Sequence, residues 1–430
     1  MQVSVENVGK LERKLTVKFP AERFESQVSA RIVEMGRTVR LKGFRPGKVP
    51  TAVINQRFGD QVRGEVLSDL IGTTLREAVA QENLRPVANP SINTTGRPED
   101  GEIAYTATFE IMPEFPEVDV AKLEISRPAS EVSDTDIEKM IETLRVQRRS
   151  FDPVERASVE GDFVMFEYSA QAGDYRFPAE GLERAGSVLG SGNLFKALDD
   201  VLTGRKADDE FDADIEFPAD FRNENLVGKT AHCHFKVIKV QEPKLPEVDA
   251  EFAKLFGIAD GNLEHFHKEV RANLERELKA TLMARLKSEV AEKLANAHPD
   301  LDVPNVMVQS EAQGLAQGSV PRGQQAPPQL VEAAMPIARK RVIAGLLMGE
   351  IARKQALVID RTRVAEQLAA IASTYEEPEQ VVELYNRDPQ LMSGLQNRVM
   401  EDQVAEWVAD HATTTVQNLG FDEVMRPVSA

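Results

Sequence analysis

Histidine and cysteine are the side chains most often used to bind metals, and the 430-residue sequence holds six His and one Cys. His232 and His234 flank Cys233 in a strand-like run, so both imidazoles share a face, but no nearby residue supplies a third ligand. His265 and His267 lie two positions apart in a helical pattern, about 200° round the axis, and cannot chelate one ion from a straight helix. The sequence therefore predicts no metal site, and the two strand histidines are interpreted as solvated residues.

Phosphate-binding loops and hydrolase nucleophiles have recognisable spacings that this sequence lacks. Gly190-Ser191-Gly192 could begin a dinucleotide-binding loop, but the position that needs a further glycine holds Phe195. No G-x-S-x-G elbow and no Walker loop occurs. We interpret the glycines as a turn, and expect no cofactor.

The stretch LKGFRPGKVP, residues 41–50, combines two Gly, two Pro, three cations and one Phe. Gly allows backbone angles closed to other residues and Pro fixes φ, so these residues predict a shaped loop. Phe44 lies between Lys42 on one side and Arg45 and Lys48 on the other, and an exposed aromatic side chain is unusual on a loop that only needs to be soluble. The composition therefore favours a binding partner at this loop.

The elements around this loop predict an α+β domain over residues 1–112. Apolar residues alternate with polar ones over 11–19 and 103–111, which is typical of half-buried strands. Apolar residues repeat with a 3.6-residue period over 24–39 and 62–79, which indicates helices. The loop should therefore lie at a projecting turn between two helices.

Proline and a change of pattern divide the rest of the chain. The run IMPEFPEV begins a linker and connecting helix at 113–151, in which Ser133 and Asp136 form a capping pair. Short strand patterns with Gly-containing turns predict a β-rich domain at 152–243, and the pattern from 244 to 430 is helical. The expected elements of this last region are a long helix at 263–294, a loop at 314–329, and helices at about 329–355, 360–374 and 388–411. Pro336 should either kink the helix at 329–355 or mark its start.

Composition limits the classes of function. A net charge of −18 argues against a general nucleic-acid binder, although residues 1–60 hold twelve Lys or Arg against six Asp or Glu. The basic N-terminal part offers no recognised reader module, so nucleic-acid binding is the weakest alternative. A single Cys fits a reducing compartment, and neither an export signal nor an apolar run of eighteen residues is present, so the cytoplasm is expected.

The string GFRPGKVP, at a turn between helices, resembles the ribosome-docking signature of bacterial trigger factor. KRVIAGLLMGEIARKQAL (340–357) and STYEEPEQVVELYNRDPQLM (373–392) resemble the C-terminal helices of that family, so the likeness covers essentially the whole chain. The resemblance implies a multidomain α+β fold with an N-terminal α+β ribosome-binding domain, an FKBP-like β-rich domain and an elongated all-α C-terminal chaperone domain. It also implies a cytoplasmic protein, partly bound to the large ribosomal subunit near the exit tunnel, that binds nascent and unfolded polypeptides.

The resemblance assigns ribosome docking to five neighbouring residues: Phe44, Arg45, Pro46, Gly47 and Lys48. The physical chemistry agrees with this assignment. Arg and Lys can bind acidic protein side chains or RNA phosphates, and Phe can supply an apolar anchor.

The same resemblance implies prolyl isomerase activity in the middle domain. Positions that resemble the catalytic pocket of FKBP-like domains are Tyr168, Phe177, Leu194, Phe195, Leu198 and Phe221. Where the family usually has an Ile-Pro-Gly-Phe-Glu-like run, this chain has NLFKALDD at 193–200, which lacks the Pro-Gly pair and places Leu198 where an aromatic floor is expected. Ala185 and Cys233 also replace Phe that is frequent in the family. Two readings stay open: a working isomerase recruited to nascent chains, and a holding chaperone whose isomerase domain is weak or vestigial.

Seven of the twelve Met residues lie beyond residue 244. Two explanations fit this enrichment: ordinary core filling, or an adaptable apolar surface for varied partners. If apolar surface is exposed in this region, the free protein could also form a homodimer.

Overall fold

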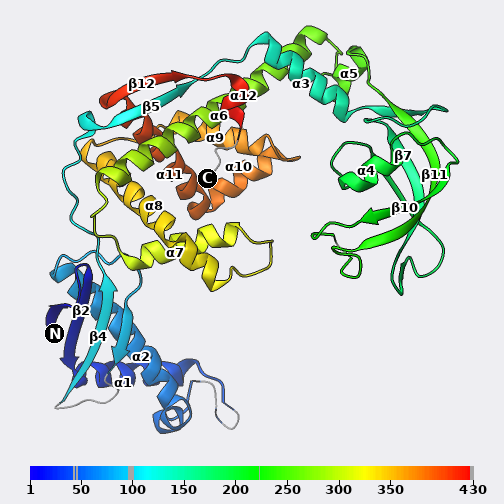
Figure 1. Ribbon diagram of the computed structural model, residues 1–430. Helices are drawn as coiled ribbons and strands as arrows, with labels where there is room; N and C mark the ends of the chain where they lie inside the picture. The colour runs from blue at the N-terminus through cyan, green and yellow to red at the C-terminus, as the bar shows by residue number, and fades with distance from the viewer. Residues whose placement is uncertain (42–43, 45–46, 95–100, 222, 427–430) are drawn as a thin grey trace. The chain divides into compact units, whose positions relative to one another are not determined.

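The computed structural model describes residues 1–41, 44, 47–94, 101–221 and 223–426 (Figure 1). It divides into two compact units that are discontinuous in sequence. One unit holds residues 1–129 and 282–418, and the other holds residues 130–281 and the segment from Leu419 onward. Helix α6 (Leu263–Ala297) contributes to both units.

The first unit begins with a four-stranded antiparallel sheet in the order β1-β2-β4-β3, packed against two helices. Val17 and Tyr105 lie opposite one another on neighbouring strands, and both are fully buried, as the alternating pattern predicts. The 41–50 segment connects the two helices, as predicted. The elements are β1 (Gln2–Asn7), β2 (Glu12–Pro20), α1 (Ala21–Thr38), α2 (Thr51–Gln81), β3 (Ser91–Thr94) and β4 (Glu102–Glu110).

The rest of this unit is mainly helical. Its core gathers apolar residues from several helices, with Val290, Leu294, Leu347 and Val408 fully buried. The predicted helices after residue 328 are confirmed, and one more, α10, lies between them. Besides the second half of α6, the helices are α7 (Asn305–Gly318), α8 (Pro328–Lys354), α9 (Arg361–Ala372), α10 (Pro378–Arg387) and α11 (Pro389–His411).

The predicted loop at 314–329 is wrong over its first residues, because α7 continues to Gly318. Packing explains the difference: Ala312 and Ala316 are buried in the helical core, and this burial outweighs the low helix propensity of Gly. Helix α8 then begins at Pro328, so Pro336 lies inside the helix and does not mark its start.

A short parallel pair of strands accompanies these helices. β12 (Thr413–Asn418) follows α11 and pairs with β5 (Glu124–Ala129), which comes after the short 3₁₀ helix η1 (Val120–Lys122). Neither strand was predicted. β12 is rich in β-branched residues, but its partner lies almost 300 residues earlier, so no local pattern indicates the pairing.

The second unit contains the predicted β-rich region, which is a six-stranded sheet with one short helix. Its strand path is β10-β11-β7-β8, and β6 and β9 pair with β11 and β7 respectively. Phe166, Phe235 and Leu202 lie in its buried core. The elements are β6 (Ser150–Pro153), β7 (Phe163–Ala172), β8 (Tyr175–Phe177), β9 (Glu183–Val188), α4 (Lys196–Leu202), β10 (Glu210–Glu216) and β11 (Thr230–Lys244).

The same unit has a second, smaller core made by helices. Phe252 and Phe266 pack against Ile141, with half-buried Phe421 at the edge. The predicted capping pair is confirmed: the Asp136 amide donates to the Ser133 hydroxyl, and the Ser133 amide donates to the Asp136 carboxylate. The helices are α3 (Asp134–Gln147), α5 (Ala250–Leu255), the first half of α6, and α12 (Phe421–Met425).

Candidate functional site

The loop between α1 and α2 presents an aromatic ring and a cation to solvent. Phe44 is 39% exposed, and its amide donates to the Leu41 carbonyl at 3.2 Å. Gly47 has φ near +76°, a backbone region that favours glycine. Lys48 is exposed, and the next residue, Val49, is buried in the core. The sequence therefore folds into a turn that leaves Phe44 accessible, while Arg45 and Pro46 lie outside the described residues.

Three predicted residues line a pocket in the β-rich domain. Tyr168 of β7, Phe177 at the end of β8 and Phe221 after β10 surround a cavity of about 470 Å³. The rings of Tyr168 and Phe177 are 6.1 Å apart between centroids. The remaining lining residues are Asn223, Glu224 and Asn225, which no motif in the sequence indicated.

The other three predicted pocket residues lie on or just before α4 and do not line this cavity. Leu194 and Phe195 are half-buried and pack against the domain core. Leu198 is 7% exposed and belongs to that core. Phe195 still contacts a lining residue, because its ring meets Phe221 edge to face. The segment that begins α4 therefore contacts the pocket indirectly, through the packing of Phe195 on Phe221.

Burial controls the ionisation of two groups near the pocket. Burial raises the pKa of the Tyr168 hydroxyl, and Glu183 and Cys233 add to the shift, so the phenol stays neutral at physiological pH. Burial also raises the pKa of the Cys233 thiol to about 11. The pocket therefore has a neutral aromatic wall, with a phenol that can donate a hydrogen bond.

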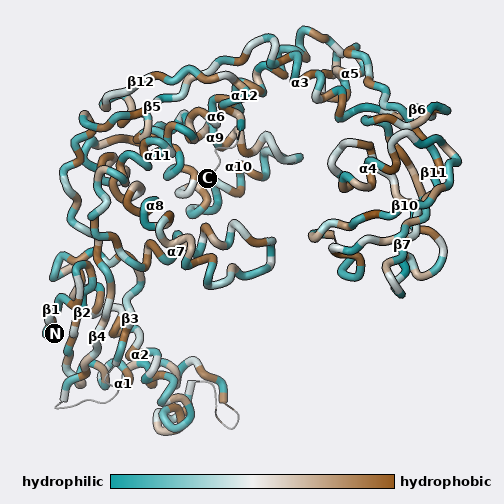
Figure 2. Tube along the Cα trace, in the orientation of Figure 1, coloured by the Kyte–Doolittle hydropathy of each residue, from teal (hydrophilic) through white to brown (hydrophobic). Residues whose placement is uncertain are grey.

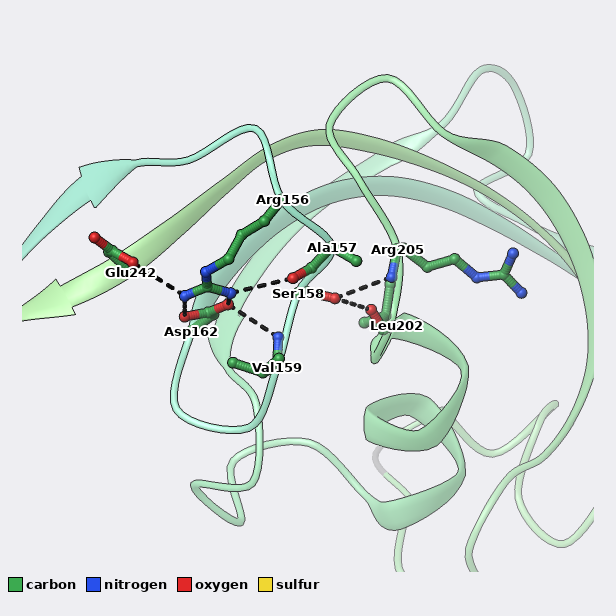
Figure 3. A network of polar contacts seen from close by, with 8 residues as sticks. All are labelled: Arg156, Ala157, Ser158, Val159, Asp162, Leu202, Arg205 and Glu242. Atoms are coloured by element: carbon green, nitrogen blue, oxygen red, sulfur yellow. Dashed lines mark hydrogen bonds and ion pairs between the residues drawn. The ribbon is translucent and has the colours of Figure 1, made fainter.

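A polar network holds the end of α4 that is far from Phe195 (Figure 3). The Ser158 hydroxyl donates to the Leu202 carbonyl at 2.7 Å and accepts from the Arg205 amide at 3.1 Å. Arg156 contacts the Asp162 carboxylate with both terminal nitrogens, at 2.5 and 2.9 Å, and also reaches Glu242. Arg156, Ser158 and Asp162 lie on the loop between β6 and β7, and their partners lie at the end of α4 and on β11.

The strand histidines lie on the outer face of the sheet and pair with carboxylates. His232 Nδ1 is 2.8 Å from Asp214, and His234 lies within 3.2 Å of both Asp212 and Glu210. Among the described residues, no group of three or more His, Cys, Asp or Glu is arranged to hold a metal ion. These two histidines of β11 therefore contact carboxylates of the neighbouring strand β10.

The helical part of the first unit has a groove of about 1020 Å³, lined chiefly by α6, α7 and α8. Small residues such as Ala291 and Gly345 leave it open, and Ile337 contributes a side chain that is 58% exposed. Of the seven C-terminal methionines, four belong to or pack against the helical core, which favours core filling over a Met-rich surface. They are Met307, Met335, Met348 and Met400.

Comparison with known families decides the relationship. The model for the bacterial trigger factor protein matches residues 1–144, and the model for the trigger factor C-terminus matches residues 262–410. The chain belongs to the bacterial trigger factor family. The family resemblance of GFRPGKVP and of the two C-terminal stretches is thereby confirmed.

Two relatives match this chain over their whole length. Trigger factor from Xanthomonas euvesicatoria pv. vesicatoria (strain 85-10) is 47% identical over 433 residues, covering 99% of this chain and 100% of the relative. Trigger factor from Stenotrophomonas maltophilia (strain R551-3) is 46% identical with the same coverage. A solved structure from work on promiscuous substrate recognition by the trigger factor chaperone is 18% identical, with a TM-score of 0.46 over 95% of this chain and 99% of that one.

Apolar and polar residues are mixed along the whole described chain. Figure 2 shows apolar and polar residues interleaved along the tube. Across the described residues, no helix has the length and apolar character that a membrane span requires.

Proposed function

We propose that this protein is a ribosome-associated chaperone that docks near the exit tunnel of the large subunit through residues 44–48. The observation that carries the proposal is that Phe44 and Lys48 are both exposed in the loop between two helices, in a member of this family. An aromatic anchor flanked by cations suits a surface of acidic side chains and RNA phosphates. Co-sedimentation of the intact chain with purified ribosomes tests the proposal, and a chain that stays in the supernatant at physiological salt contradicts it.

The helical part of the first unit supplies the surface for nascent and unfolded polypeptides. Exposed apolar side chains are spread over its helices and connections, and the groove between α6, α7 and α8 adds a longer open surface. Each small patch contributes little binding energy, so many unfolded sequences can bind and leave rapidly. The exposed residues include Leu330, Ile337, Val358, Tyr375 and Leu384.

The aromatic pocket carries prolyl isomerase activity. This reaction crosses a barrier of about 18–20 kcal/mol and needs no acid, base or metal, because an apolar pocket can hold the twisted imide away from water. Tyr168, Phe177 and Phe221 supply such walls, and the neutral Tyr168 hydroxyl can donate to a substrate carbonyl. Their convergence on one cavity supports this reading.

The alternative is a holding chaperone with a vestigial isomerase domain. The run NLFKALDD favours it, because Leu198 packs in the core and gives the cavity no aromatic floor. Conversion of an unstructured X-Pro peptide and suppression of client aggregation, measured on the same intact chain, separate the two. Background isomerisation with full suppression supports the alternative, and a clear catalysed rate rejects it.

The proposed function also predicts the cellular location and the oligomeric state of the protein. A chaperone of this kind works in the cytoplasm, partly bound to ribosomes and partly free. Exposed apolar side chains on the helical surface leave homodimer formation by the free protein as a prediction, which sedimentation velocity can test.

A further inference from the structure

Helix α4 joins the pocket to a distant polar network through its two ends. At its start, Phe195 is the N-cap residue, and its ring contacts Phe217 and Phe221 at 5.4 and 5.8 Å between centroids. Its last residue is Leu202, whose carbonyl accepts a hydrogen bond from Ser158. The helix has only seven residues, so a displacement of one end moves the other.

Ser158 ties its loop to the end of α4 with both its side chain and its backbone. Its hydroxyl bonds the Leu202 carbonyl and the Arg205 amide. Its own amide donates to the Arg205 carbonyl at 2.8 Å, and its carbonyl accepts from the Gly204 amide at 2.8 Å. Ser158 is 1% exposed, so water cannot replace these four bonds without opening the domain.

Asp162 fixes the loop that carries Ser158. Its carboxylate, which is 1% exposed, accepts two hydrogen bonds from Arg156 and one from the Val159 amide at 2.9 Å. The carboxylate therefore closes the turn that follows Ser158 (Figure 3). The guanidinium group and the carboxylate are both planar and form two parallel hydrogen bonds, so the pair fixes the orientation of the Asp162 side chain in this turn.

We propose that Ser158, Arg156 and Asp162 are positioning residues for the aromatic pocket, acting through α4 and Phe195 on the wall formed by Phe221. The inference rests on the proposed isomerase function. None of the three residues lines the cavity, so they do not touch the substrate. Without these residues, the Phe221 side chain is held less rigidly. This weakens binding of the twisted imide in the transition state more than binding of the ground-state peptide.

The test compares two pairs of variants of the intact chain in a peptide isomerisation assay. Ser158→Ala and Arg156→Gln are expected to lower kcat about tenfold while KM changes less than about twofold. Arg156→Lys, which keeps one ion pair with Asp162, should recover part of the loss. Arg184→Gln is the matched control, because Arg184 forms an arginine–carboxylate pair with Glu167 at 2.6 Å between β9 and β7, and should leave kcat unchanged.

Amide hydrogen exchange on the same variants measures local opening at the end of α4, independently of activity. The amides of Thr203 and Gly204 should exchange faster in Ser158→Ala, while those of β7 and β11 keep their protection. Faster exchange with unchanged kcat would overturn the inference and leave the isomerase function standing. A parent chain at the uncatalysed rate would overturn the isomerase function, and with it the role of these residues.

Discussion

The rings of Phe195 and Phe221 meet edge to face, with centroids 5.8 Å apart and an interplanar angle of 77°. One ring begins α4 and the other lines the pocket, so this contact joins the domain core to the cavity wall. Edge-to-face pairs are a favoured aromatic geometry, which stabilises both side chains. The cavity wall is therefore packed against an aromatic residue that does not itself line the cavity.

The first prediction concerns the pocket walls. Phe177→Ala and Phe221→Ala should each lower kcat/KM for an X-Pro peptide about tenfold or more, because each removes an apolar wall that the twisted imide needs. Phe151→Ala is the matched control, since Phe151 packs on Phe163 and does not line the cavity. Equal rates in all three variants would place catalysis outside this cavity.

The pocket also shows how far the sequence could predict a site. Tyr168, Phe177 and Phe221 belong to separate elements, and only the family resemblance grouped them; the fold brings them to one cavity. Asn223 lines the same cavity and bonds the Tyr175 hydroxyl, but it lies in a polar run with no motif. Leu198 was expected at the pocket floor, yet helical spacing turns it into the core. Long-range packing decides these positions.

The second prediction concerns the single cysteine. Cys233 is 1% exposed and burial raises its pKa to about 11, so native protein at pH 8 holds very little accessible thiolate. A chromogenic disulfide reagent should label it at least about 100-fold more slowly in the native chain than in denaturant. Labelling of the native chain at the rate of a free thiol would contradict this burial.

The third prediction concerns acid stability of the β-rich domain. Burial alone would raise the pKa of Asp162, but hydrogen bonds from Arg156 and the Val159 amide outweigh it and hold the pKa below its ordinary value. The ionised carboxylate therefore stabilises the fold above its unfolded pKa, and this contribution disappears as pH falls through the folded pKa. The stability advantage of the parent over Asp162→Asn should shrink below about pH 4.

Urea titrations at several pH values can measure this difference. Cys233 lies in the same domain, so its exposure to a disulfide reagent that reacts in acid reports the opening of that domain. If the difference in unfolding free energy between the parent and Asp162→Asn stays constant from pH 7 to pH 3, the ionised Asp162 carboxylate does not stabilise the fold.

The fold itself divides into parts that local sequence predicts and parts that it cannot. Alternation predicted β2 and β4, and the 3.6-residue period predicted α1 and α2, because each pattern reflects burial of one face. The pairing of β5 with β12 has no such signal, since the two short parallel strands are far apart in the sequence. The division into two discontinuous units also has no local signal, because each unit joins segments that are far apart in the sequence.

The affinity of the intact chain for ribosomes tests docking through residues 44–48 most directly. The variant Phe44→Ala/Arg45→Ala/Lys48→Ala removes the proposed anchor and its cations. The control Val33→Ala/Arg23→Ala/Lys18→Ala removes one exposed apolar side chain and two exposed cations elsewhere on the same domain. Circular dichroism should show both variants folded.

Co-sedimentation across a ribosome titration, at fixed salt, gives the result. The Phe44 variant should lose at least about tenfold in affinity while the control binds like the parent. Undiminished binding by the Phe44 variant would contradict docking through this loop.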